Sequence, residues 1–152
     1  MNQSCISRAA GLLGLLFVLL LVGCGRNATE YDLDEKSFDA DSSKLIEDAT
    51  SFDVPAGARG LRFHYVPPID PIYFAKHEIP AADQKAVEAE IAKLMPEKDF
   101  PDGMANNRCT WWPKSFAGAL ISKKSGSDRH NTEVHLIREE GRLVLYLKYR
   151  VL

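Results

Sequence analysis

Residues 132–152 read TEVHLIREEGRLVLYLKYRVL, and this stretch decides the fold because it encodes two strands with a turn between them. Side chains alternate in character on both sides of Glu139-Glu140-Gly141-Arg142, and a period of two residues is typical of strands with one buried face. The sequence therefore predicts a β-hairpin that turns at 139–142. In its second strand, one face carries Leu143, Leu145, Leu147, Tyr149 and Val151, whereas the other carries Val144, Tyr146, Lys148 and Arg150.

Three further segments on the N-terminal side of this hairpin are predicted to be strands. Residues 115–122 precede it and complete a three-stranded meander. Residues 61–66 alternate in the same way, and residues 72–79 are rich in aromatic and β-branched side chains. The connector Pro67-Pro68-Ile69-Asp70-Pro71 holds three prolines, which leave few amide donors for pairing, so we expect a stiff loop here.

Residues 80–95 change period and predict the one amphipathic helix of the domain. Val87, Ile91 and Leu94 fall at helical spacing, and Pro96 ends the pattern. Because one such helix can cover one face of a sheet, we expect a two-layer α+β domain with this helix packed on a mainly antiparallel sheet. The opposite face is expected to be either solvated or a binding surface, since it carries Arg62, His64, Lys148 and Arg150.

The N-terminus has the pattern of an export signal. Residues 1–8 hold one basic residue and no acid, and the fifteen residues 9–23 hold no charge. That run is shorter than the roughly 20 apolar residues that a membrane-spanning helix needs. It ends on Leu21-Val22-Gly23-Cys24, which resembles the lipobox of bacterial lipoproteins.

The resemblance implies that residues 1–23 are removed and that Cys24 becomes a lipid-carrying N-terminus. It implies a diacylglyceryl group on the Cys24 sulfur and a fatty acid on its new amine, and more than one chain gives durable anchoring. The protein is then expected on the extracytoplasmic side of a cell membrane. In a cell with two membranes the outer one, facing the periplasm, is favoured, because Gly25 is not the aspartate that retains lipoproteins in some inner membranes.

Charge divides the remaining chain into two parts. Residues 24–50 hold eight acidic and three basic residues, a net charge of −5, and few large apolar side chains. We interpret them as an acidic, flexible tether. Residues 51–152 hold thirteen acidic and fifteen basic residues, a net charge of +2, and are predicted to form a single domain.

Cys109 would be the single thiol left in the mature chain beside the lipidated Cys24. It cannot form an internal disulfide, and its surroundings match no cysteine-protease signature, so we expect a buried, unreactive side chain. No catalytic residue and no cofactor is predicted.

The best candidates for contact with a partner are Arg108, Trp111, Trp112 and Lys114. In an extended segment, adjacent side chains point to opposite faces, so one Trp could enter the core while the other stays near the surface. An exposed Trp between two bases could anchor a protein or stack on a sugar or peptide. The alternative is that one ring fills the core and the other covers its edge.

These features favour a non-enzymatic binding or envelope-associated protein, with the membrane and a protein or envelope component as its partners. Nucleic acid is not expected, because no recognition motif is present and the location is outside the cytoplasm. One alternative is a small envelope hydrolase or metal-binding protein that uses His64, His77 or His135, although the chain has no dense metal-ligand motif. The other is an inhibitor or immunity-type lipoprotein.

Overall fold

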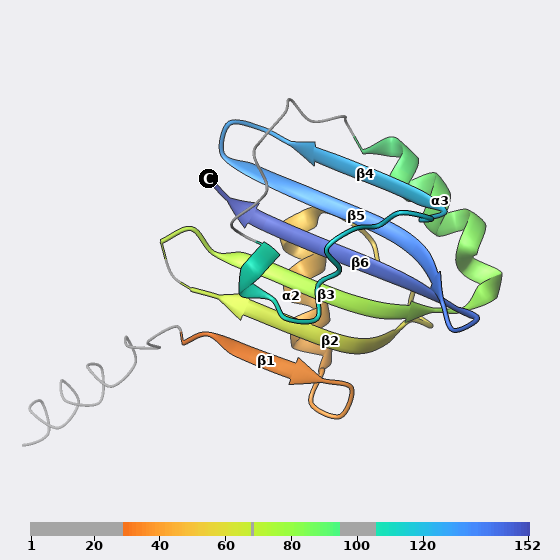
Figure 1. Ribbon diagram of the computed structural model, residues 1–152, viewed down its shortest axis with the longest axis horizontal. Helices are drawn as coiled ribbons and strands as arrows, with labels where there is room; N and C mark the ends of the chain where they lie inside the picture. The colour runs from red at the N-terminus through yellow and green to blue at the C-terminus, as the bar shows by residue number, and fades with distance from the viewer. Residues whose placement is uncertain (1–28, 68, 95–105) are drawn as a thin grey trace, which may run out of the picture.

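A computed structural model describes residues 29–67, 69–94 and 106–152 of the chain (Figure 1). The predicted signal peptide and the predicted lipidation site, Cys24, lie outside these residues. The described residues form one six-stranded sheet, two α-helices and two short 3₁₀ helices. In chain order the elements are β1 (Tyr31–Asp34), α2 (Ala40–Thr50), β2 (Arg59–Val66), β3 (Ile72–Ile79), η1 (Ala81–Asp83), α3 (Gln84–Lys93), η2 (Asn106–Arg108), β4 (Ile121–Gly126), β5 (His130–Glu139) and β6 (Arg142–Val151).

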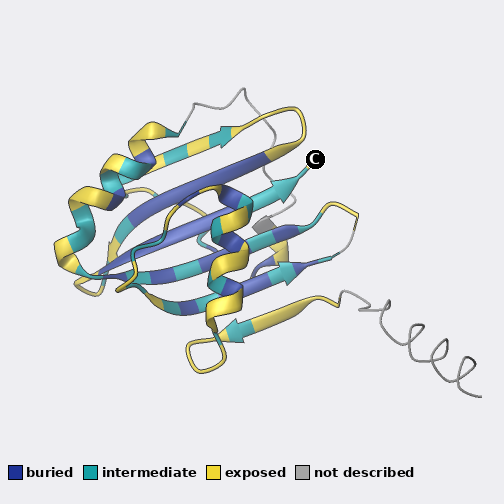
Figure 2. Ribbon diagram, turned by 180° about the vertical axis from the view of Figure 1, so that it is seen from behind, coloured by how far each residue is buried: buried dark blue, intermediate teal, exposed yellow. Residues whose placement is uncertain are grey.

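The sheet has the order β1-β2-β3-β6-β5-β4, and every neighbouring pair is antiparallel. Both helices lie on the same face, which Figure 2 shows from their side. The predicted α+β class, the antiparallel sheet and the final β4-β5-β6 meander are confirmed. No helix within the described residues is long and apolar enough to cross a membrane.

The β5–β6 hairpin has the predicted turn and the predicted alternation. Glu140 and Gly141 have φ values of 50° and 81°, the left-handed conformation that a two-residue hairpin turn requires at both positions. Glu139 therefore pairs with Arg142, and this register carries through to His130 and Val151. Every second side chain of β6 then faces the helices, as the sequence predicts.

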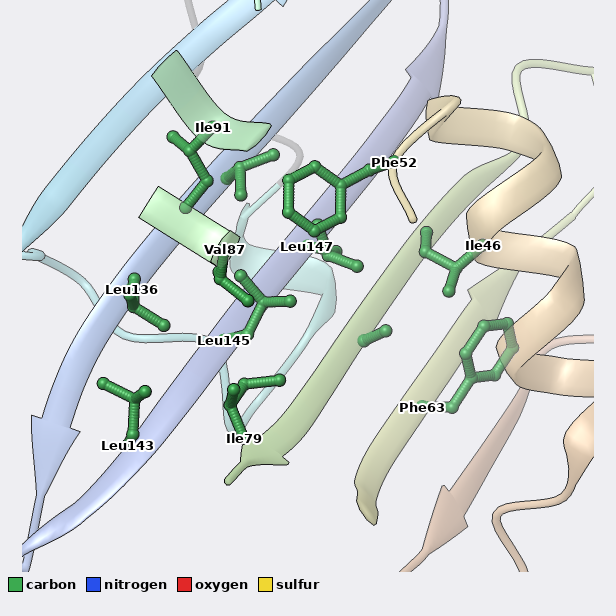
Figure 3. Close-up of a cluster of buried hydrophobic side chains, with 12 residues drawn as sticks. Ile46, Phe52, Phe63, Ile79, Val87, Ile91, Leu136, Leu143, Leu145 and Leu147 are labelled. Atoms are coloured by element: carbon green, nitrogen blue, oxygen red, sulfur yellow. The ribbon is translucent and has the colours of Figure 1, made fainter. Parts of the chain in front are cut away.

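The helix-facing side of the sheet holds the larger hydrophobic core (Figure 3). Leu143, Leu145 and Leu147 of β6 lie at its centre and are at most 3% exposed. Residues from β2, β3, β5, both helices and the loop after α2 complete it: Ile46, Phe52, Phe63, Ala75, Ile79, Val87, Ile91, Val134 and Leu136.

The predicted helix at 80–95 is confirmed as the short helix η1 followed by α3. Val87 and Ile91 are buried in the core, and Leu94 packs against it. Residue 95 lies outside the described residues.

The interpretation of residues 24–50 as a flexible tether is wrong for residues 31–50. β1 pairs with β2, from Tyr31 opposite Tyr65 to Asp34 opposite Arg62. Asp39 is the N-cap of α2, and its carboxylate accepts a hydrogen bond from the Ser42 amide at 2.8 Å. The expectation of a single helix is corrected too, and the domain begins at β1 rather than at residue 51.

The centre of the other face of the sheet is covered, which corrects the expectation that this face is solvated. The segment 106–120 crosses this face, on the viewer's side in Figure 1. Cys109, Trp112 and Phe116 of this segment pack on Phe74 and Tyr146 in a second core. The predicted strand at 115–122 is also corrected: Gly118 has a φ of 85°, which breaks the extended backbone, and β4 begins only at Ile121.

His77 is buried beneath α2 and remains neutral over an unusually wide pH range. Its ring is 1% exposed, its Nε2 lies 3.4 Å from the Ser43 hydroxyl, and the Phe38 ring meets it edge-on. Burial lowers the pKa of His77 from 6.5 to about 4, because the apolar surroundings penalise the charged form.

This burial predicts a loss of stability in mild acid. Between pH 6.5 and 4 the unfolded chain binds a proton at His77 that the folded chain excludes, so stability is complete above pH 6.5 and falls with pH. The free energy of unfolding should decrease by up to about 3 kcal/mol from this group. Urea unfolding of His77→Gln should show a flatter pH dependence than the native chain.

The matched control is His130→Gln, since His130 is an exposed histidine of β5. It should keep the pH dependence of the native chain. An unchanged pH dependence in His77→Gln would contradict the assignment of this effect to His77.

Candidate functional site

The two adjacent tryptophans have different surroundings. Trp112 is 5% exposed, and its ring meets Phe74, Phe116 and Tyr146 at centroid distances of 5.1, 5.4 and 5.6 Å. It is a core residue, so the expectation that it contacts a partner is corrected. Trp111 is half-buried at the edge of the same core and stays available for contact.

Two acidic residues at the start of the domain hold the exposed edge of this segment. Glu30 pairs with Arg108 at 2.6 Å, and the Asp32 carboxylate accepts a hydrogen bond from Trp111 Nε1 at 3.1 Å. The same two carboxylates lie 3.3 and 3.1 Å from Nε2 and Nδ1 of His64. These five residues form a cluster that fastens β1 to segment 106–120, and we call it the Trp111 cluster.

The Trp111 cluster fixes the orientation of an aromatic side chain at the surface. The Arg62 guanidinium lies 5.9 Å from the Trp111 ring centroid, within cation–π range. Hydrogen bonding to Asp32 limits rotation of the indole. A fixed, half-buried ring loses little entropy on binding, which suits stacking on a sugar or peptide.

The two predicted basic contact residues differ in availability. Arg108 is paired with Glu30, although 51% of its side chain stays exposed. Lys114 is exposed on the same segment. The structure thus brings Arg108 and Trp111 into one cluster. Lys114 is near this cluster in the sequence but is not a member of it.

Cys109 is buried, as the sequence predicts. Its side chain is 3% exposed, and it is the free cysteine of the described residues. Burial raises the pKa of the thiol to about 12, against smaller effects of the Trp111 and Trp112 amides that lower it. A thiol that is not ionised at neutral pH is a poor nucleophile.

The three histidines of the metal or hydrolase alternative do not converge. His77 faces the helices, whereas His64 and His135 lie on the opposite face. Although these two share a face, β3 and β6 separate their strands. No group of His, Cys, Asp or Glu able to hold a metal ion occurs among the described residues.

A buried polar network on β4, β5 and β6 was missed by sequence reasoning. Lys148 is 0% exposed and donates to Glu133, which is 3% exposed. The other Glu133 oxygen lies 3.4 Å from His135 Nε2, and His135 Nδ1 lies 2.9 Å from the Ser122 hydroxyl. We call Ser122, Glu133, His135 and Lys148 the Glu133 network.

This network has the residue order of a Ser-His-Glu relay, but its surroundings favour a structural role. Lys148 neutralises Glu133, and the His135 ring stacks on Phe116 at a centroid distance of 3.7 Å. Both contacts hold the group in place inside the second core. The Glu133–Lys148 pair could have been predicted from the hairpin register, because a turn at 139–142 sets Glu133 directly opposite Lys148.

A cleft of about 490 Å³ lies on the helix side, away from both groups. It opens between α2 and the loop before β2, and its lining includes Phe38, Lys44, Glu47, Pro55 and Arg59. None of its lining residues was predicted as a site from the sequence.

Comparison with protein-family models, with curated proteins and with solved structures finds no match for this chain.

Because the Lys148–Glu133 ion pair is buried, replacing Lys148 alone should strongly reduce the stability of the fold. Lys148→Met leaves the Glu133 carboxylate buried without its nearest cation, with Lys124 Nζ still 3.9 Å away, and should reduce the free energy of unfolding by up to about 3–5 kcal/mol. Adding Glu133→Gln should restore most of this loss, because the unpaired charge is removed. Chemical denaturation of the single and double variants measures both.

Lys44→Met is the control for loss of a lysine. Its exposed pair with Asp48 should contribute about 0.5 kcal/mol or less. Similar losses for Lys148→Met and Lys44→Met would contradict the buried-pair account.

In the Trp111 cluster, Glu30 and Asp32 are expected to hold β1 in place. Asp32→Ala removes the acceptor of Trp111 and one partner of His64, so amide hydrogen exchange over residues 31–34 should become several-fold faster. Global stability should decrease by about 1 kcal/mol or less, because these carboxylates are partly exposed. Asp48→Ala, an exposed acid of α2, should leave exchange in β1 unchanged, and an equally unchanged Asp32→Ala would disprove this role of Asp32.

Proposed function

We propose that this chain is a lipid-anchored extracytoplasmic protein whose domain binds a protein or an envelope component without catalysing a reaction. The observation that carries the proposal is the sequence Leu21-Val22-Gly23-Cys24 at the end of an uncharged run of fifteen residues. Lipid at Cys24 would hold the domain at the membrane. In a cell with two membranes, Gly25 favours the outer membrane and its periplasmic side.

The binding part of the proposal is centred on Trp111. Its ring is half-buried, fixed by Asp32 and flanked by Arg108, with the exposed Lys114 three residues further on. A surface aromatic with a fixed orientation and adjacent polar groups is a common contact residue. No nucleic acid is proposed as a partner, and no cofactor is required.

The two alternatives have less support. A metal or hydrolase site that combines two or more of His64, His77 and His135 is disfavoured, because His77 lies on the other face of the sheet and two strands separate His64 from His135. An inhibitor or immunity-type lipoprotein fits the same anchor and domain size, but no residue argues for it specifically.

Lipidation is tested directly on the full chain. Expressed in a bacterium with labelled palmitate, the native protein should incorporate label and sediment with membranes, because its acyl chains partition into the bilayer. Intact-mass analysis should place Cys24 at the new N-terminus.

Cys24→Ser is the decisive variant, and Cys5→Ser is its matched control. Cys24→Ser should lose label and membrane association, whereas Cys5→Ser should keep both. An unlabelled native protein, or a Cys24→Ser variant that still carries label, would exclude the proposed anchor.

A further inference from the structure

The proposed anchor lies very near the first strand. Tyr31, the first residue of β1, follows Cys24 by seven residues. An extended residue spans at most about 3.3–3.6 Å, so this connection reaches about 25 Å or less. With residues 31–50 inside the domain, the start of β1 is restricted to the vicinity of the bilayer.

The start of β1 shares one end of the sheet with other segments. The register places Tyr31 opposite Tyr65, Val66 opposite Ile72, and Ile72 opposite Arg150. The β2–β3 loop, the β4–β5 loop and the C-terminus therefore lie at this end, which is on the left in Figure 1.

Backbone hydrogen bonds join these segments into one surface. The Val151 amide donates to the Pro71 carbonyl at 3.1 Å, and the Leu152 amide donates to the Arg129 carbonyl at 2.8 Å. Loops on both sides of β6 are thus tied to it. We call this surface, with Tyr31, Ile69 and Leu152, the Ile69 end.

The Ile69 end gathers exposed apolar side chains. Of the five large hydrophobic residues exposed among the described residues, three lie here: Tyr31 at 38%, Leu152 at 37% and Ile69 at 88%. Of the other two, Leu45 on α2 lines one pocket together with Tyr31, and Leu120 lies just before β4. Ile69 is thus the most exposed of the five.

The loop that carries Ile69 suits insertion into an apolar layer. Pro67 and Pro71 restrict the backbone on both sides of the tip, so ordering the tip on binding costs little entropy. The charges around it are balanced, with Asp70 and Asp128 against Arg129 and Arg150. Attraction to charged headgroups is therefore weak, and the favourable contribution is burial of apolar surface.

We infer that the Ile69 end docks on the bilayer beside the lipid anchor, with the Ile69 side chain reaching the acyl-chain boundary. This rests on the proposed lipidation of Cys24, which brings the surface to the membrane. Docking would hold the sheet upright, so that the opposite end, with Leu120, points away from the membrane. Trp111 would then face sideways into the aqueous space.

A fluorescent label at position 69 tests the inference on the full, lipidated chain. Ile69→Cys and Leu120→Cys are labelled with an environment-sensitive dye, and Cys109 stays unmodified because it is buried. Each protein is reconstituted into vesicles of phosphatidylcholine and phosphatidylglycerol that contain lipids brominated in their acyl chains. We expect quenching to be several-fold greater at position 69 than at position 120.

Leu120 is the matched control because it is an exposed aliphatic side chain of the same size as Ile69. It is 43% exposed and lies at the end of the sheet opposite the Ile69 end. Equal quenching at the two positions, in protein that floats with the vesicles, would overturn the docking and leave the lipid anchor standing. Protein that does not float because Cys24 carries no lipid would refute the proposed anchor, and the docking with it.

Discussion

Both faces of the β5–β6 hairpin are buried, and this burial determines where the helices and segment 106–120 pack. Leu143, Leu145 and Leu147 enter the core beneath the helices, while Val144 and Tyr146 enter the core beneath segment 106–120. A strand with two covered faces cannot leave a charge in water. Lys148 therefore needs Glu133, and the hairpin register supplies it directly across the strand pair.

Much of the fold could be predicted from periodicity, and the failures have a physical cause. β6 and α3 were found because large apolar side chains mark their buried faces. α2 was missed because its buried positions are Ser42, Ile46 and Thr50, two of which are small and polar. Its hydroxyls are satisfied locally, for example by Thr50 donating to the Ile46 carbonyl at 2.6 Å, and hydrophobic patterning does not detect such a stripe.

The candidate site was predictable only in part. The sequence pointed to Arg108 and Trp111, and adjacency suggested that one tryptophan would be buried. Their partners Glu30 and Asp32 were not predicted, because they were assigned to a solvated tether some 80 residues earlier in the chain. Contacts between such distant segments depend on strand order, and the pairing of β1 with β2 was not foreseen.

Because β1 and α2 belong to the domain, the segment between the proposed anchor at Cys24 and the domain is short. It ends at Tyr31 rather than at residue 50. Neutron reflectometry of the lipidated full chain on a supported bilayer tests this most directly. We expect protein density to begin at the headgroups. A water-filled layer thicker than about 25 Å between bilayer and domain would contradict it, because the extended connection from Cys24 to Tyr31 cannot span more.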